Sequence, residues 1–399
     1  MARTSRSSSR RSPNSSPRGN IRTNCFEGGV RKVIGRFEYQ GFVDVHVHFR
    51  DPGNPRAETS ATGLACARRG GFAAVVAMPN TAPAGDSVEW VRRNLALRGP
   101  EGQRVFPSAC LTEGRRGEKV AELERLAEAG AAFFTDDGSY VEEAKVMEEA
   151  MRRAARLEIA VCQHAMTWKG RTPGVIRACA LARRLGLPVV DPQVETDAIC
   201  RDLAICRVTG CALHVQHIST AEGVGLVRAA QREGLPVTAE ATPHHLLLSC
   251  DDLTADDANF KMAPPLGSRE DRAELRKAVK EGVLMFATDH APHPAEAKDG
   301  GFAKAANGII GLETAIGITY KVMVEEEGMD QTDWARAWTE MPRRLFPASC
   351  APALEALPPT RIEVGAPRTW RLQASASRSR NCPYDGMVFD CRPVQPDNP

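Results

Sequence analysis

The sequence lacks any apolar run close to the roughly 20 residues that a helix needs to cross a bilayer, so we expect a soluble protein. It also lacks a charge excess, because 52 basic residues stand against 50 acidic ones. Such a balance gives no general surface for nucleic acid or another polyanion. At 399 residues and 42% hydrophobic content, however, the chain is long enough for one large domain with a substantial core.

Signals for disulfide bonds are missing as well. The 12 cysteines include no Cys-x-x-Cys pair, and no secretory signal peptide is recognisable. We therefore expect reduced thiols and a cytoplasmic protein. Cys162 lies two residues before His164 and could serve as an extra soft metal ligand, but a buried packing thiol is the favoured interpretation.

Acidic residues are absent from the first 18 positions, which hold seven serines and five arginines. Such a stretch cannot bury enough apolar surface to fold, so residues 1–20 are predicted to be a disordered basic tail. An organelle transit peptide is the alternative, although the stretch lacks the leucines of an amphipathic helix. A short N-terminal segment, residues 21–40, follows the tail.

The sequence does contain a series of strand-like apolar runs. They occur at about 42–48, 72–78, 104–110, 131–135, 158–163, 211–217, 235–240 and 283–288. Stretches rich in Ala, Leu, Arg and Glu with helical spacing separate most of them. These repeated units predict an α/β fold, a (β/α)8 TIM-type barrel over residues 41–350, with its active site at the carboxyl ends of the strands.

Metal-binding residue types gather at these strand ends. The first strand ends in His46 and His48, whose side chains share one face of the strand and converge on one point. Other strand ends carry Asp136, Asp137, His164, His214, His217, Asp289, His290 and His293. Four histidines and two carboxylates around one barrel mouth exceed the ligand count of a mononuclear zinc site, so we predict two metal ions.

The spacing of these residues in the sequence leaves two questions open: which aspartate bridges the metals, and what His244 and His245 do. Either Asp136 or Asp137 could bridge the two metals, while Asp289 would accept a proton from the attacking water and return it to a leaving nitrogen. His244 and His245 follow a turn after the seventh run, and for them a structural role is favoured over metal binding.

Seven motifs, in this order, resemble the dihydroorotase family of the amidohydrolase superfamily, in its bacterial form with an aspartate bridge between the metals. They are 46–53 (HVHFRDPG), 78–81 (MPNT), 134–138 (FTDDG), 217–220 (HIST), 261–265 (KMAPP), 287–293 (ATDHAPH) and 311–314 (GLET). The resemblance extends over about residues 41–350, with a fainter echo near the C-terminus.

The resemblance implies a zinc-dependent cyclic amide hydrolase that interconverts (S)-dihydroorotate and N-carbamoyl-L-aspartate in pyrimidine (UMP) synthesis. It implies two zinc ions in each subunit, one bound by His46 and His48 and the other by His164 and His217. It also favours Asp137 as the bridge. Asp289 is implied to be both a metal ligand and the catalytic acid and base.

The same resemblance implies the residues that bind substrate. Arg50 and Asn80 match residues that hold the substrate carboxylate, and the planar fork of an arginine suits such a group. His293 matches a further substrate contact. Asn307 and Gly308 align with a loop that touches the substrate.

Some positions depart from the family pattern. Ala263 stands where an asparagine is usual, 306–308 replaces Pro-Phe-Gly, and Ala165-Met166 replaces Cys-Glu. Because one lost donor–acceptor pair costs about 1–3 kcal/mol, a hydantoinase- or allantoinase-like enzyme with an altered substrate is one alternative. Those relatives bridge their metals with a carboxylated lysine, however, and residues 131–137 contain no lysine.

A second alternative is a catalytically lapsed barrel that acts as a scaffold for aspartate carbamoyltransferase. The presence of every expected metal ligand weighs against it. A homodimer or a complex with that enzyme is the expected assembly, as the resemblance implies. The C-terminal segment, residues 351–399, is predicted to be the remnant of a small β-domain, left incomplete and with an unpaired edge because its N-terminal partner strands are missing.

Overall fold

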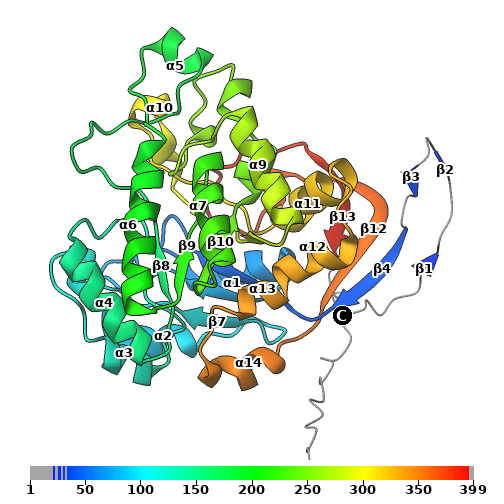
Figure 1. Cartoon of the computed structure of the whole chain (residues 1–399). Helices are drawn as coiled ribbons and strands as arrows, with labels where there is room; N and C mark the ends of the chain where they lie inside the picture. Colours follow the sequence, from blue (N-terminus) through cyan, green and yellow to red (C-terminus); the bar gives the residue numbers. More distant parts are fainter. Residues whose placement is uncertain (1–20, 23–25, 28–29, 32–33, 395–399) are drawn as a thin grey trace, which may run out of the picture.

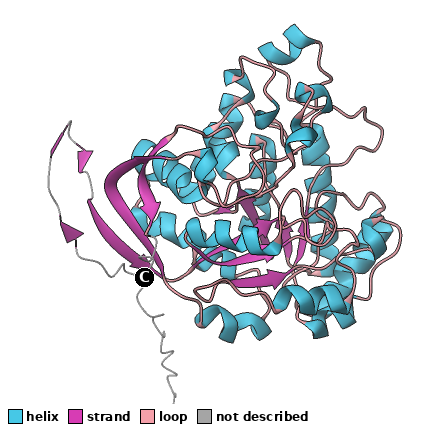
Figure 2. Cartoon of the chain, turned by 180° about the vertical axis from the view of Figure 1, so that it is seen from behind, coloured by secondary structure: helices cyan, strands magenta, loops and turns pink. Residues whose placement is uncertain are grey.

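The computed structural model describes residues 21–22, 26–27, 30–31 and 34–394 (Figure 1). The predicted disordered tail, residues 1–20, lies outside the described residues. A barrel wrapped in helices forms the bulk of the described chain, and a small antiparallel sheet lies beside it (Figure 2). Among the described helices, none combines the length and the apolar character needed to cross a bilayer.

Seven strands form most of the barrel wall. They are β5 (Phe42–Val47), β6 (Phe72–Ala77), β7 (Arg104–Pro107), β8 (Val161–Gln163), β9 (Leu213–Val215), β10 (Val237–Ala241) and β11 (Met285–Phe286). β5, β6 and β7 pair in parallel, and β8 to β11 pair in parallel in a second run. Every residue of β5 and β6 is buried, as expected for strands that are covered on both faces.

The expected fourth strand, residues 131–135, is reduced to isolated bridges. Phe134 forms one parallel bridge with Ala109 and another with Val161, and so joins the two runs of strands. A parallel bridge between Val47 and His290 closes the ring. The predicted barrel is thus confirmed. The fourth predicted run takes its place in the wall, because Ala132 N donates to Pro107 O and Thr135 N donates to Ala109 O, both at 2.8 Å.

The described chain contains a series of helices, most of which cover the outside of the barrel (Figure 1). They are α1 (Ser60–Arg69), α2 (Val88–Leu95), α3 (Leu123–Ala129), α4 (Ala144–Arg156), α5 (Ala180–Leu185), α6 (Gln193–Thr209), α7 (Ala221–Arg232), α8 (Pro243–Leu247), α9 (Arg269–Lys280), α10 (Gly301–Lys304), α11 (Ala315–Thr319), α12 (Gln331–Trp338), α13 (Glu340–Arg343) and α14 (Ala351–Glu355). In α4 the buried residues Met147, Ala150, Met151 and Ala154 recur every three or four positions, which turns one apolar face toward the strands.

Aromatic side chains pack at the amino ends of the strands. Phe42 and Phe72 begin β5 and β6, and their rings lie 6.5 and 5.1 Å from the ring of Trp338 on α12. All three side chains are buried. This apolar packing supports the barrel at one end, so the polar strand ends can gather at the other.

The small sheet is built from both ends of the described chain. Its order is β1 (Ile21–Arg22), β4 (Ile34–Tyr39), β12 (Thr360–Thr369) and β13 (Val388–Pro393), all antiparallel, and β2 (Phe26–Glu27) pairs with β3 (Val30–Arg31) in a separate hairpin. β4 pairs with β12 over five residues. The expectation that the C-terminal strands lack an N-terminal partner is therefore wrong, because residues 34–39 supply one.

Candidate metal centre and substrate pocket

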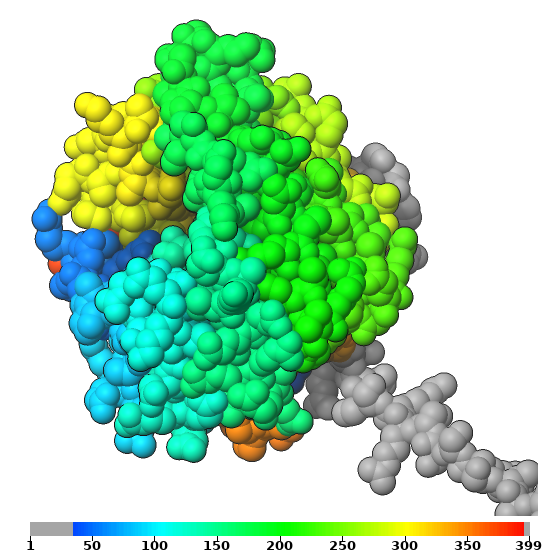
Figure 3. All heavy atoms as spheres, turned by 60° about the vertical axis from the view of Figure 1, so that its left-hand side comes forward, coloured from blue at the N-terminus to red at the C-terminus, as the bar shows by residue number. Residues whose placement is uncertain are grey.

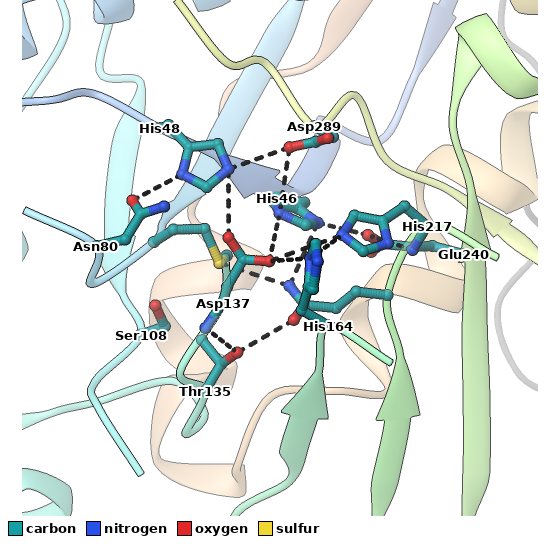
Figure 4. A network of polar contacts seen from close by, with 12 residues as sticks. His46, His48, Asn80, Ser108, Thr135, Asp137, His164, His217, Glu240 and Asp289 are labelled. Atoms are coloured by element: carbon teal, nitrogen blue, oxygen red, sulfur yellow. Dashed lines mark hydrogen bonds and ion pairs between the residues drawn. The ribbon is translucent and has the colours of Figure 1, made fainter. Parts of the chain in front are cut away.

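Four histidines and two aspartates come together at the carboxyl ends of the barrel strands (Figure 4). His46 lies on β5, and His48 directly follows that strand. Asp137 follows the Phe134 segment. His164, His217 and Asp289 follow the ends of β8, β9 and β11, in that order. All six side chains are buried or nearly so. Residues from five separate strand ends thus meet at one place, as the barrel fold predicts.

The carboxylate of Asp137 lies at the centre of this group. Its Oδ1 is 3.3 Å from His46 Nε2, and its Oδ2 is 3.3 Å from His48 Nε2. On its other side, Oδ1 lies 3.7 Å from His164 Nδ1 and 3.8 Å from His217 Nε2. Asp137 therefore belongs to two clusters of possible metal ligands, one with each histidine pair.

Two atoms in this group have unmet hydrogen-bonding capacity. His46 Nε2 and Asp137 Oδ1 are buried, face each other, and make no hydrogen bond. Leaving a buried polar atom unsatisfied costs about 1–3 kcal/mol. Imidazole nitrogen and carboxylate oxygen are ligands that zinc accepts, so the donor set fits a metal at this position.

The neighbouring carboxylate, Asp136, points elsewhere. Its Oδ1 accepts hydrogen bonds from the main-chain N–H groups of Leu111 (2.9 Å) and Thr112 (3.1 Å), and its Oδ2 accepts one from the Thr112 hydroxyl. Because Asp136 is occupied by the loop after β7, only Asp137 has the geometry of a bridging ligand. The geometry therefore favours Asp137 over Asp136, and its bridging role stays a prediction.

A buried glutamate that the sequence reasoning missed holds two of the histidines. Glu240 on β10 lies 2.6 Å from His46 Nδ1 through Oε1, and its Oε1 also accepts the main-chain N–H of His217 at 3.2 Å. Its Oε2 is 2.9 Å from His214 Nε2. Burial alone would raise the pKa of Glu240, but His46 and His214 lower it to about 2.

An ionised Glu240 keeps a proton on His46 Nδ1, which leaves the Nε2 lone pair for a metal. His48 is oriented in the same way, because its Nδ1 donates to Asn80 Oδ1 at 2.8 Å. The sequence contained one signal for Glu240, namely an acidic residue within an otherwise buried strand pattern. Asn80, predicted to bind substrate, thus has a contact with a candidate metal ligand.

Asp289 lies over the first histidine pair. Its Oδ1 is 3.1 Å from His48 Nε2 and 3.4 Å from His46 Nε2. Burial would raise the pKa of this carboxyl, but His46 and His48 outweigh burial and hold the pKa well below its usual range. Asp289 is therefore ionised and close to the site where a metal would bind.

Three of the five non-glycine residues with positive φ in the described chain lie at this mouth, the other two being Arg115 and Glu158. Asp289, His217 and Arg50 have φ values of +47°, +32° and +54°, in the left-handed region that side chains other than glycine rarely adopt. Each such residue costs of order 1–3 kcal/mol and persists only where the surroundings enforce it. Strain at Asp289, His217 and Arg50 is typical of an active site.

The residues predicted to bind substrate line one cavity of about 310 Å³ together with Asp137 and Asp289. They are Arg50, Asn80, His293, Asn307 and Gly308. In Figure 3 the segments near residues 50 and 300 border a recess in the surface. Met166, Trp168 and Ala263 give the cavity an apolar side.

Arg50 and His293 present polar groups to this cavity. Arg50 Nε donates to Pro292 O at 3.2 Å, and burial lowers the pKa of its guanidinium to about 10, so the group stays charged at neutral pH. His293 Nε2 donates to the main-chain oxygen of Asn307 at 2.7 Å. Burial and the charge of Arg50 lower the pKa of His293 to about 3, so its Nδ1 is a neutral acceptor.

Gly308 shapes the wall of the cavity, and its main-chain polar groups are bonded to other parts of the protein. Its N–H donates to Lys261 O at 2.9 Å, and its carbonyl accepts from Asn381 Nδ2 (3.0 Å) and Lys298 Nζ (3.1 Å). Its φ is +141°, and a Cβ there would lie 2.7 Å from Ala291 O. The backbone thus needs glycine at this wall.

The other histidines and Cys162 lie outside both clusters around Asp137. His245 Nε2 donates to Pro264 O at 3.0 Å, and its Nδ1 pairs with Thr242 Oγ1 at 2.8 Å. His244 is buried beside it, with ring centroids 4.5 Å apart. Cys162 is fully buried in β8. The contacts of His245 suit the structural role favoured for it, whereas His244 Nε2 is buried without a hydrogen-bond partner, and its role stays a prediction.

Known proteins with similar sequences were compared with this chain, and they agree with the resemblance found in its motifs. Residues 35–223 match the family model described as Dihydro-orotase-like. A dihydroorotase of Geobacillus sp. (strain WCH70) is 40% identical over 371 residues, which cover 92% of this chain and 86% of that protein. A dihydroorotase of Anoxybacillus flavithermus is 43% identical over 301 residues, covering 74% and 70%.

Solved structures share the fold at lower identity. The L-hydantoinase of Arthrobacter aurescens superposes with a TM-score of 0.78 at 23% identity, covering 90% of this chain and 83% of that one. The dihydroorotase of Saccharomyces cerevisiae, solved with 5-fluoroorotic acid, has a TM-score of 0.65 at 15% identity, covering 90% and 98%. Given the extent and identity of the sequence matches, this chain belongs to the dihydroorotase family.

Proposed function

We propose that this protein is a zinc-dependent dihydroorotase, which interconverts (S)-dihydroorotate and N-carbamoyl-L-aspartate in pyrimidine synthesis. The observation that carries the proposal is the shared carboxylate of Asp137, which lies within 3.8 Å of both histidine pairs beside a cavity that contains Arg50. Family membership supports the substrate class, since the curated relatives at 40% identity are dihydroorotases.

Two zinc ions are assigned to this site. His46 and His48 would hold one ion, with Asp289 beside them, and His164 and His217 would hold the other. Asp137 would bridge the pair. Zinc bound here lowers the pKa of water and polarises a carbonyl group, which are the two requirements for opening a cyclic amide at neutral pH.

The chain's own residues supply proton transfer and orientation. In the hydrolytic direction Asp289 accepts the proton of the attacking water and returns it to the ring nitrogen as the amide bond breaks. Arg50 binds the substrate carboxylate through its guanidinium, since only its Nε is bonded to the main chain at Pro292. Asn80 orients His48 and, with His293, Asn307 and Gly308, shapes the pocket for the substrate ring.

The alternatives have weaker support. The L-hydantoinase of Arthrobacter aurescens is 23% identical to this chain, and the yeast dihydroorotase is 15% identical. Sequence identity this low supports a shared fold but not a shared substrate. The segment 131–137 contains no lysine for a carboxylated bridge. A lapsed scaffold has no reason to keep all six ligand candidates together. The proposal also includes the assembly, which is a homodimer or a complex with aspartate carbamoyltransferase, and a cytoplasmic location. Its domain bounds are a barrel over residues 41–350 with flanking segments at 21–40 and 351–399.

The first test measures zinc content and dihydroorotate hydrolysis on the same purified sample. The proposal expects about two zinc ions per chain together with turnover. Two zinc ions with no turnover on dihydroorotate, but turnover on a hydantoin, would replace the substrate assignment. A folded protein without bound metal would favour the scaffold alternative.

A single variant tests the catalytic role within that framework. Asp289→Asn is expected to lower kcat by about 10²–10⁴-fold, because the amide cannot accept a proton. The zinc content should stay near that of the unsubstituted protein. Turnover close to normal in this variant would remove Asp289 from the catalytic role.

A further inference from the structure

The loop between β12 and β13 reaches the barrel mouth and is buried there. Ser377, Ser379 and Asn381 are each no more than 3% exposed. Ser379 Oγ donates to Ala57 O at 2.7 Å, and Ser377 Oγ donates to Glu58 Oε2 at 2.6 Å. A segment that belongs to the small sheet by connectivity is thus bonded to the loop that follows β5.

Asn381 uses every polar atom of its side chain at this mouth. Nδ2 donates to Ala291 O at 2.9 Å and to Gly308 O at 3.0 Å, and Oδ1 accepts from His293 N at 3.1 Å. Its main-chain oxygen also accepts from Ile310 N at 3.0 Å. A buried side-chain amide with all its polar groups satisfied fixes its partners relative to one another.

The partners of Asn381 belong to the two segments that form one wall of the substrate pocket. Residues 291–293 carry His293, and Pro292 O holds Arg50 Nε at 3.2 Å. Residues 307–308 include Asn307, whose main-chain oxygen accepts a hydrogen bond from His293 Nε2. Lys298 also supports the second segment, through Ala306 O and Gly308 O, but it makes no bond to residues 291–293. Asn381 is bonded to both segments at once.

We propose that Asn381 is a positioning residue for substrate binding: it sets the spacing between residues 291–293 and 307–308, and through Pro292 it sets the direction of the Arg50 guanidinium. This proposal rests on the proposed function, since it takes that wall to bind the substrate carboxylate and ring. Asn381 contacts no candidate metal ligand directly. Its effect should therefore fall on KM rather than on metal content.

The test compares Asn381→Ala with Ser379→Ala. Both remove buried side-chain hydrogen bonds of the same loop, but the Ser379 hydroxyl donates to Ala57 O, outside the pocket wall. Asn381→Ala is expected to raise the KM for dihydroorotate by roughly 10- to 100-fold, with a much smaller change in kcat, because a misplaced binding group weakens orientation. Ser379→Ala should lower thermal stability and leave KM unchanged. Zinc content should be equal in all three proteins.

Asn381→Asp provides a second variant in case alanine prevents folding. It keeps the size of the side chain and the acceptor for His293 N, but replaces two donors with a carboxylate facing the carbonyls of Ala291 and Gly308. KM should rise at least as far as in Asn381→Ala. A normal KM in either folded Asn381 variant, or an equal rise in Ser379→Ala, would overturn the positioning role.

A readout without catalysis separates this proposal from the proposed function. Hydrogen exchange at the main-chain amide of His293 should become faster in Asn381→Ala and stay slow in Ser379→Ala. Exchange at His293 that is unchanged in Asn381→Ala would overturn the positioning role even if the protein fails to hydrolyse dihydroorotate. Absence of turnover in the unsubstituted protein, with faster exchange in the variant, would count against the substrate assignment alone.

Discussion

Within the part of the chain that the structure describes, two buried clusters bring together residue types that bind metals, and they differ in how far their polar atoms are hydrogen-bonded. The first surrounds Asp137; the second consists of Glu58, Cys66 and His290, whose ligand atoms lie within 4.8 Å of one another, as do those of each Asp137 cluster. In the first, His46 Nε2 and Asp137 Oδ1 have no hydrogen-bond partner. In the second, the protein itself satisfies the carboxylate and the imidazole.

The contacts of the second cluster explain this difference. Glu58 accepts from Ser377 Oγ (2.6 Å) and from the Thr62 hydroxyl, and lies 3.4 Å from His290 Nε2. His290 Nδ1 accepts the main-chain N–H of Gly311 at 3.1 Å. Burial raises the pKa of the Cys66 thiol well above its usual range, so the thiol is protonated beside the bonded carboxylate and imidazole. Unsatisfied atoms, rather than proximity alone, distinguish the candidate metal centre.

The largest effect is expected from the shared carboxylate. Asp137→Asn should remove the bridging charge, lower zinc content below two ions per chain, and reduce turnover by more than about 10³-fold, a loss comparable to that of a catalytic group. Elemental analysis measures the zinc content, and a dihydroorotate hydrolysis assay measures the turnover. Asp136→Asn is the matched control: it should keep its zinc and lower stability by about 1–3 kcal/mol through the bonds to Leu111 and Thr112. Metal loss confined to the Asp136 variant would reverse the assignment.

A smaller effect is expected from the carboxylate behind the first histidine pair. Glu240→Gln should weaken zinc binding or activity by about 10- to 100-fold, because the amide no longer enforces a proton on His46 Nδ1. Competition with a chromophoric chelator measures the zinc Kd. Asp202→Asn, which alters a buried carboxylate bonded to Arg201 at 2.8 Å, should leave that Kd unchanged. Equal zinc affinity in all three proteins would show that Glu240 does not tune the centre.

The second cluster should respond only in stability. Glu58→Gln is expected to lower the free energy of unfolding by about 1–3 kcal/mol, because the amide leaves the proton of His290 Nε2 or a neighbouring hydroxyl without its acceptor. Urea denaturation measures this change, and elemental analysis should still give two zinc ions per chain. A loss of one metal equivalent in this variant would mean that the second cluster is a metal site, which would break the distinction.

The smallest effect is expected at the thiol of that cluster. Cys66→Ala should lower stability by about 1 kcal/mol, as for a modest loss of buried packing, and leave metal content and kcat unchanged. Cys200→Ala, at an exposed cysteine, should change stability by less than about 0.5 kcal/mol. Reduced zinc in Cys66→Ala would assign the thiol a ligand role that its protonation argues against.

Much of this arrangement could be predicted from the sequence because the barrel imposes strong regularities. Alternation on a strand places His46 and His48 on one face, and the parallel strand order brings Asp289 to the same mouth. The distinction between Asp136 and Asp137 could not be predicted from spacing, because it depends on which main-chain donors the loop after β7 offers. Those donors, at Leu111 and Thr112, are visible only in the fold.

Two further elements escaped prediction for similar reasons. Glu240 has no motif of its own, and its importance comes from contacts with histidines on two other strands. Asn381 is separated by 73 residues from Gly308 and by 90 from Ala291, and periodicity carries no information over such separations. The pairing of β4 with β12 was missed because a single six-residue strand, residues 34–39, was not recognised.

The hydrogen bonds from Asn381 to the pocket wall also have a consequence for the order of events during protein synthesis. The strands of the barrel ring and their helices are all encoded before residue 356, yet the wall that holds His293 and Gly308 is completed by a side chain at position 381. A growing chain can thus close its barrel before its pocket is finished. The nascent enzyme should acquire its fold first and its full affinity for substrate later.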